Sequence, residues 1–245
     1  MKNYPTKVIS FSLFGDDDRY TYGAIKNAEL AQTTMPDFEC WFYVDETVPK
    51  WCIKQLSSFN NTKIIKNTLP NNVPKTLSRF LAFEKADIIV VRDTDDRMSV
   101  RSAVAVQEWI DSGLSFHIIK DHPEGHSALI LAGMWGGKGQ ELRNIKELIL
   151  SYYETNKEIS RNSDQEFLAN TIYPKILNNC LFHNEFYTPQ ILGYSKMIKF
   201  STPNRYPSNY IGVALNKDDY FVYNNDSVAN NHKKYEYDLD LLERE

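Results

Sequence analysis

The sequence predicts a single α/β domain in which helices flank a mainly parallel central sheet. Short β-type runs alternate with helical patterns from residue 7 onward, which is the arrangement of βαβ units. The run Asp87–Val91 is apolar through its interior, as expected of a central parallel strand with both faces buried. A length of 245 residues with 42% hydrophobic content suits one large or two small globular domains and excludes a disordered scaffold.

The first half of the chain supplies most of the predicted sheet. Lys7–Leu13 is a β-type run that ends in a glycine-bearing loop, and Tyr22–Thr33 follows as a helix with alanines spaced along one face. Glu39–Val44 is rich in aromatic and β-branched residues and therefore predicts a second strand. In chain order we expect further helices at Lys50–Phe59, Thr76–Lys85 and Val100–Asp111, and further strands at Lys63–Lys66, Asp87–Val91 and Ser115–Ile119.

The second half has weaker patterns. Gln140–Tyr153 and Asp164–Tyr173 are expected helices, the latter opened by Ser163 as N-cap with Glu166 three positions on. The charged tail, residues 233–245, is expected to form a frayed helix. Beyond Pro174 we expect short strands at Cys180–His183, Met197–Phe200, Tyr210–Val213 and Tyr220–Tyr223.

Composition narrows the function classes. Lys and Arg total 28 against 32 Asp and Glu, a net charge of −4, so nucleic acid is not an expected partner. No apolar stretch reaches the roughly 18 residues of a membrane helix, and no cleavable signal follows the first apolar run. Three widely spaced cysteines without a Cys-x-x-Cys pair disfavour a disulfide framework and fit a reducing cytoplasm.

An acidic cluster follows one of the most apolar predicted strands. Asp93, Asp95 and Asp96 stand directly after Asp87–Val91, and ligands of open parallel sheets bind outside the carboxyl ends of the strands. Two carboxylates one residue apart can share a hard divalent cation with substrate phosphates. An isolated Asp-x-Asp is common by chance as a polar loop, but three acids between two arginines are electrostatically costly unless a ligand organises them.

A second group of polar residues follows the next predicted strand. Asp121, His122 and His126 come directly after it, with satisfied loop histidines as the ordinary alternative. The glycines and tryptophan of residues 132–137 suggest backbone that approaches a ligand closely. Asp164 at a helix start suits a general base, and the imidazole of His183 could either complete a metal site or be structural.

These motifs resemble a family of metal-dependent GT-A (Rossmann-like) glycosyltransferases found in bacterial polysaccharide clusters and large DNA viruses. The resemblance extends from Ser12 to about Gly212 and is most specific in the centre. It rests on Tyr22–Asn27, Tyr43–Asp45, Leu77–Phe80, Val91–Arg97, Glu108–Gly113, Asp121–Pro123, His126, Gly133–Gly136 and Asp164-Gln165. It implies one GT-A domain over residues 1–245, with a nucleotide-binding half (1–98), a donor-sugar and acceptor half (99–232) and a charged tail (233–245).

The resemblance also implies roles for individual residues. Asp93 and Asp95 match the Asp-x-Asp motif that holds Mn²⁺ or Mg²⁺ and, through the ion, the donor diphosphate, and His183 matches a third metal ligand found in some members. Asp164 and Asp121 are the candidate catalytic residues, Asp164 beside the reacting carbon and Asp121 toward sugar hydroxyls. The expected donor-binding residues are Gly15, Tyr43, Asp45, Arg79, Asp93, Gly133, Trp135 and Gly136.

The expected activity is transfer of a sugar from a nucleotide-diphosphate donor, a UDP-sugar in first place, to a glycan acceptor. The expected location is the cytoplasm, or the host cytoplasm for a viral chain. The sequence departs from the family pattern at Asp96, Ser102, Lys120, Ala132 and Asn184, and Asp96 is expected to add negative charge at the metal.

Three alternatives stay open on sequence alone. A haloacid-dehalogenase-type phosphatase also carries Asp-x-Asp after an apolar strand, but on its first strand. A catalytically silent nucleotide-sugar-binding module is favoured by Asp96 and Asn184. A nucleotidyltransferase is less favoured, because no glycine-rich, arginine-bearing loop follows the first strand.

Overall fold

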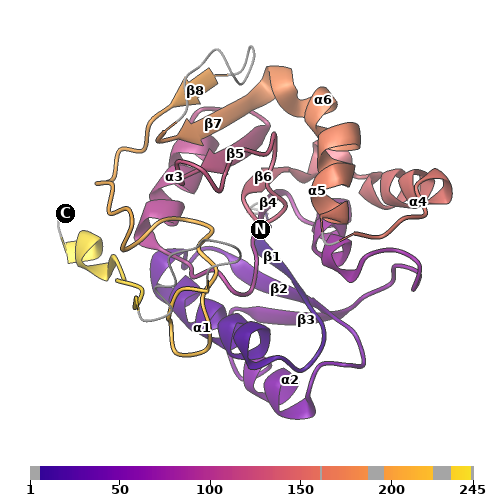
Figure 1. Cartoon of the computed structure of the whole chain (residues 1–245), viewed down its shortest axis with the longest axis horizontal. Coiled ribbons are helices and arrows are strands. Elements are labelled where there is room, and N and C mark those ends of the chain that lie inside the picture. Colours follow the sequence, from indigo (N-terminus) through magenta and orange to yellow (C-terminus); the bar gives the residue numbers. More distant parts are fainter. Residues whose placement is uncertain (1–5, 161, 187–195, 223–232, 244–245) are drawn as a thin grey trace, which may run out of the picture.

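The computed structural model describes residues 6–160, 162–186, 196–222 and 233–243 (Figure 1). In these residues eight strands form one sheet in the order β3-β2-β1-β4-β6-β5-β7-β8. All neighbours in the sheet are parallel except β6, which runs antiparallel between β4 and β5. The chain is therefore one mixed α/β domain, and none of its described helices is long and apolar enough to cross a membrane.

Three predicted elements have the expected bounds, and the other predicted elements of the first half differ at their ends. β1 (Lys7–Leu13), β2 (Glu39–Val44) and α3 (Val100–Asp111) match the prediction. The remaining elements of this half are α1 (Asp18–Thr34), α2 (Lys50–Leu56), β3 (Thr62–Lys66), a 3₁₀ helix (Lys75–Glu84), β4 (Ile88–Val91) and β5 (Phe116–Lys120). Capping explains the earlier start of α1, because the Asp17 side chain accepts a hydrogen bond from the Arg19 N–H at 2.8 Å.

The second half departs further from its predicted elements. The helix expected over 140–153 divides into a 3₁₀ turn (Gly139–Leu142) and α4 (Ile145–Thr155), and the helix expected over 164–173 divides into α5 (Ser163–Phe167), a π-helical segment (Leu168–Ile172) and α6 (Tyr173–Ile176). Ser163 lies in the first turn of α5 and not at its N-cap; its hydroxyl accepts the Ser160 N–H at 2.7 Å.

The last strands are short. β7 spans Cys180–Asn184 and β8 spans Lys196–Ile198. The strands expected at 210–213 and 220–223 are replaced by isolated bridges such as Leu215–Phe221, and Tyr223 lies outside the described residues. The described part of the tail forms a 3₁₀ helix, Leu239–Glu243, where a frayed α-helix was expected.

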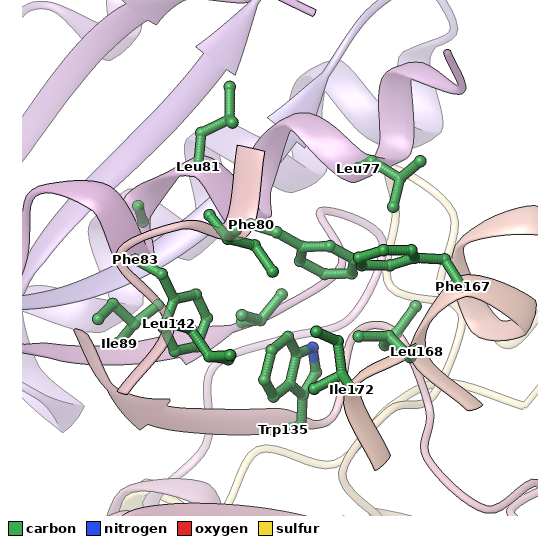
Figure 2. Close-up of a cluster of buried hydrophobic side chains, with 14 of the residues drawn as sticks. Leu77, Phe80, Leu81, Phe83, Ile89, Trp135, Leu142, Phe167, Leu168 and Ile172 are labelled. Atoms are coloured by element: carbon green, nitrogen blue, oxygen red, sulfur yellow. The ribbon is translucent and has the colours of Figure 1, made fainter. Parts of the chain in front are cut away.

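Helices cover both faces of the sheet. On one face α1 lays Ala24, Ala28 and Ala31 against the strands, together with residues of α2 and α3. On the other face the 3₁₀ helix Lys75–Glu84 packs with α4, α5 and α6 around Phe80 and Trp135 (Figure 2). Because both faces are covered, most strand side chains are buried and apolar, and Asp93 and Asp95 follow β4 at the carboxyl-terminal edge of the sheet.

The C-terminal segment, residues 200–222 and 233–243, returns to that edge (Figure 1, orange to yellow). Asp219 pairs with Lys26 of α1 at 2.5 Å and with Arg97 at 2.9 Å. Asp238 accepts the N–H groups of Val100 and Arg101 at 2.9 and 2.8 Å, which satisfies the first turn of α3. These contacts place residues 210–222 over the ends of the central strands.

Candidate active site

Asp93 and Asp95 lie at the carboxyl end of β4 and line a cleft of about 1050 Å³. The other walls come from the β1–α1 loop, residues 122–134, the start of α5 and the C-terminal segment. The open end of a parallel sheet is where α/β proteins bind ligands, because loops diverge there and leave a crevice. The cleft therefore lies where the sequence predicted the functional edge.

The turn that carries the two acids is held from α1. Asn27 donates to the carbonyls of Thr94 at 3.2 Å and Asp96 at 2.9 Å, and its side-chain oxygen accepts the Met98 N–H at 2.9 Å. The Arg97 guanidinium donates to the carbonyl of Asp96 at 2.9 Å. These bonds satisfy the backbone of a buried turn and leave its first and third side chains directed to the cleft.

Each of the two carboxylates is paired with an arginine. The buried Arg79 bonds Asp93 through one amino group and Asp164 through the other, the latter at 3.0 Å. Arg19, in the first turn of α1, pairs with Asp95. Burial raises the pKa of Asp95 and the charge of Asp93 raises it further, whereas Arg19 lowers it.

The donor set fits a hard divalent cation. Asp93 and Asp95 offer carboxylate oxygens in one cleft, and Mg²⁺ is usually held by one or two carboxylates together with substrate phosphates. A methyl group on Gly133 would stand 1.9 Å from Oδ2 of Asp93, so the glycine leaves the space that this carboxylate occupies. In the described residues no three His, Cys, Asp or Glu side chains form a group that could hold a metal.

Asp164 lies in the same cleft, at the start of α5. Its carboxylate accepts from Arg79 and from the Gln165 N–H at 2.9 Å. Burial raises the pKa of Asp164, and Arg79 opposes that shift. A largely buried acid at the cleft wall is the arrangement that a general base uses.

His183 lies away from this group, which argues against its expected role as a metal ligand. It is fully buried on β7, with His117 at 2.8 Å from one ring nitrogen and Glu108 at 2.6 Å from the other. Since β6 and β5 separate β7 from β4, three strand spacings of about 4.8 Å each keep it roughly 14 Å from the acidic turn. Burial also lowers the pKa of His183 although Glu108 raises it.

Trp135, Gly136 and Tyr43 lie in the sheet and not on the cleft. Figure 2 shows Trp135 inside the hydrophobic cluster, and its ring stacks on Phe83 with centroids 5.0 Å apart. The first part of the glycine-rich segment, residues 132–134, lines the cleft, whereas the rest belongs to the antiparallel strand β6 (Trp135–Lys138), in which Gly136 pairs with Val90. Tyr43 is buried on β2, so none of the three contacts the space available to a donor.

Asp121 is engaged in an interior ion pair, at odds with a catalytic role. Arg101 donates to both of its carboxylate oxygens at 2.8 Å, and the Ile211 N–H donates at 3.0 Å. Only 1% of Asp121 is exposed, and it does not line the cleft. This carboxylate instead ties α3 and β5 to the C-terminal segment.

Asp96 also faces the interior, contrary to the expectation that its charge adds to the metal site. It is buried beneath the turn and is not part of the cleft wall. Burial raises its pKa to about 7, with Arg92 opposing the shift. The negative charge beside the acidic turn therefore comes from Asp93, Asp95 and Asp164, and Asp16, Asp17 and Glu124 add to it elsewhere in the cleft.

Gly15 and Asp45 are linked through Thr47 at the mouth of the β1–α1 loop. The Gly15 N–H donates to Oγ1 of Thr47 at 2.7 Å, and Asp45 accepts from the Thr47 backbone at 2.9 Å. Asp45 also pairs with Lys75. Gly15 lines the cleft with φ +76°, whereas Asp45 supports it from outside.

Several cleft residues escaped the sequence reasoning. Phe14 and Tyr20 line the cleft on either side of the acidic loop 16–18, and Arg19 and Tyr210 line it as well. Phe14 and Tyr20 could have been found from their position, because these aromatic residues flank the glycine and the acids of the loop that follows the first strand.

Solved structures provide the comparison, since no protein-family model matches the sequence and no curated protein matches it. TarS of S. aureus (residues 1–349) superposes with a TM-score of 0.51 at 14% identity over 72% of this chain and 57% of that one. The glycosyltransferase GlyE of Streptococcus pneumoniae TIGR4 superposes with a TM-score of 0.52 at 12% identity over 73% of this chain and 45% of that one. The fold is GT-A. The galactosyltransferase LgtC, solved with donor and acceptor sugar analogues, gives a TM-score of 0.47 at 14% identity over 72% of this chain and 73% of its own.

The GT-A chain spans roughly half the length of TarS and GlyE. Its structural neighbours are glycosyltransferases. At these identities the similarity establishes the fold, and the chemistry has to be argued from the cleft itself.

Proposed function

We propose that the chain is a divalent-metal-dependent glycosyltransferase that moves a sugar from a nucleotide-diphosphate donor to a glycan acceptor. The observation that carries the proposal is the pair Asp93 and Asp95 at the carboxyl end of a buried strand, in a cleft of about 1050 Å³ within a GT-A fold. A cleft of that size accommodates a nucleotide sugar. The preference for a UDP-sugar rests on the family resemblance of the sequence.

Asp93 and Asp95 would hold Mn²⁺ or Mg²⁺. When bound, the ion supplies positive charge to the departing diphosphate, whose charge grows in the transition state. Arg79 orients Asp93 and Asp164 with one guanidinium group, so the metal-binding side and the catalytic side of the cleft share one buried anchor.

Asp164 is the proposed base if the reaction inverts the sugar configuration. It would take the proton of the acceptor hydroxyl, and its lining position gives that hydroxyl access. A retaining reaction requires no strong base. The acceptor would approach from the C-terminal segment, where Tyr210 lines the cleft.

The test is release or transfer of sugar from UDP- and GDP-sugars with and without Mn²⁺. Asp95→Ala and Asp93→Asn are expected to reduce metal-dependent turnover at least 100-fold. Asp87→Asn is the matched control, because Asp87 is an exposed acid that precedes β4 at its opposite end, in an ion pair with Arg143 at 3.2 Å. It is expected to retain wild-type turnover.

Three results would contradict the proposal. Full metal-dependent activity of Asp95→Ala would remove its central observation. A covalent phosphoaspartate at Asp93 would identify a phosphatase. Nucleotide binding without turnover of any donor would identify a catalytically silent binding module.

A further inference from the structure

Two guanidinium groups occupy the acidic end of the cleft, and they differ in how firmly they are held. Arg79 is 3% exposed and bridges two carboxylates, and its backbone N–H donates to the Ser12 hydroxyl at 3.0 Å. Arg19 reaches Asp95 from α1 by a single amino group, with 17% of its side chain exposed. The Arg79 side chain is thus fixed by its burial and its two ion pairs, whereas the Arg19 side chain can change its direction.

The Arg19 guanidinium has unused hydrogen-bonding capacity. The Nε atoms of Arg19 and Arg79 are both buried without a hydrogen-bond partner among the described residues, but Arg79 uses both of its amino groups whereas Arg19 uses one. The Arg19 side chain lines the cleft beside Asp95, and its backbone is secured independently by the Asp17 cap. Since a guanidinium carries five donors in a planar fork, one carboxylate oxygen uses only part of what Arg19 offers.

The charges of the cleft suggest what the remaining donors are for. Six carboxylates line the cleft, those of Asp16, Asp17, Asp93, Asp95, Glu124 and Asp164, against the guanidinium groups of Arg19 and Arg79. The cleft is therefore net negative, and a diphosphate would need both a divalent cation and a guanidinium as positive partners there. A cation at Asp95 and the Arg19 guanidinium would compete for the same oxygen. A released guanidinium in the same cleft matches the oxygens of a phosphate, which it binds with its planar fork.

We propose that Arg19 is the counter-ion of Asp95 in the free protein and a ligand of the donor diphosphate, an inference that rests on the proposed function. Arg19 holds the Asp95 carboxylate in the free protein, gives it up when a divalent cation binds, and turns its guanidinium to the diphosphate. Metal binding alone is then weakened by Arg19, whereas metal and nucleotide together are favoured by it. The two ligands should bind cooperatively for this reason.

The test measures binding and does not depend on turnover. Calorimetric titration with MnCl₂ alone is expected to show at least fivefold tighter binding to Arg19→Ala than to the wild type, because the competitor is gone. Titration with UDP at saturating Mn²⁺ is expected to show at least tenfold weaker binding. Arg19→Gln, which keeps polar bulk but not charge, should change both affinities in the same directions and serves if the alanine variant does not fold.

The matched control is Arg205→Ala, which also removes one arginine from an ion pair, with Asp240 at 2.6 Å, outside the cleft. It is expected to leave both affinities within twofold of the wild type. Variants at Arg19 that bind Mn²⁺ no more tightly, or UDP no more weakly, than the wild type would overturn the inference and leave the proposed function standing. A wild-type protein that binds neither Mn²⁺ nor UDP would overturn both.

Discussion

The ion pair between Asp121 and Arg101 gives a sharp test of which acids belong to the interior and which to the cleft. Asp121→Asn keeps the size of the side chain and removes its charge. In the wild type Asp121 accepts two charge-assisted hydrogen bonds from Arg101 at 2.8 Å. Removing its charge would leave the Arg101 guanidinium with Glu185, at 3.1 Å, as its remaining acidic partner. Removing one member of a buried pair costs about 3–5 kcal/mol, and Glu185 sets the expectation near 3 kcal/mol.

Urea unfolding at neutral pH measures this loss, and thermal unfolding should show a Tm lower by about 6–12 °C for a chain of this length. Asp111→Asn, at the exposed end of α3, is the control and should stay within about 0.5 kcal/mol of the wild type. A double-mutant cycle with Arg101→Met should give a coupling free energy of at least about 1.5 kcal/mol. A loss of stability below about 1 kcal/mol, together with a collapse of turnover per folded molecule, would refute this reasoning and return Asp121 to the catalytic residues.

Three further variants test the cleft and its surroundings. Gly133→Ala should weaken nucleotide binding in the presence of Mn²⁺ at least tenfold in calorimetry, because the added methyl group occupies the place of the Asp93 carboxylate; unchanged affinity would contradict this. Burial lowers the pKa of Lys120 to about 8, so above pH 8 the unfolded chain retains a proton that the folded chain releases. The unfolding free energy of the wild type should therefore rise relative to that of Lys120→Met between pH 8 and 10. A constant difference in unfolding free energy between the two proteins across that range would argue against this assignment. His183→Gln should leave Mn²⁺ affinity within twofold while costing about 1–3 kcal/mol of stability in urea unfolding, because Glu108 loses its partner at 2.6 Å; a large loss of Mn²⁺ affinity would restore His183 as a metal ligand.

Local patterns were enough to predict most of the framework. The bounds of β1, β2 and α3 follow from apolar runs and helical periodicity, which depend on neighbouring residues along the chain. The 3₁₀ helix Lys75–Glu84 and the divided helices after residue 139 were harder to predict, because their hydrogen-bonding pattern depends on the packing of Phe80 and its neighbours.

The glycine-rich segment before residue 138 shows how tertiary context overrides a local pattern. Its composition suggested a loop near a ligand, yet Trp135–Lys138 is inserted as an antiparallel strand between β4 and β5. Glycine at position 137 is needed there because a methyl group would stand 2.7 Å from the ring of Phe116. Close packing inside a sheet and close approach of the backbone to a ligand both require glycine, so a glycine-rich sequence does not distinguish the two.

By itself the sequence determined the fold class, the acidic turn after an apolar strand and the edge of the sheet where a ligand would bind. Gly15, Arg79, Asp93, Asp95, Gly133 and Asp164 line one cleft. The strand-end position pointed to Asp93 and Asp95, whereas Gly15 and Arg79 were expected only from the family resemblance. Only the tertiary structure decided which other candidates reach that cleft. Strand order separates His183 from the acidic turn, and the interior faces of the strands bury Tyr43 and Trp135. The physical reason is that a sequence shows where a strand ends, whereas the order of strands and the face to which each side chain points are set by packing across the whole sheet.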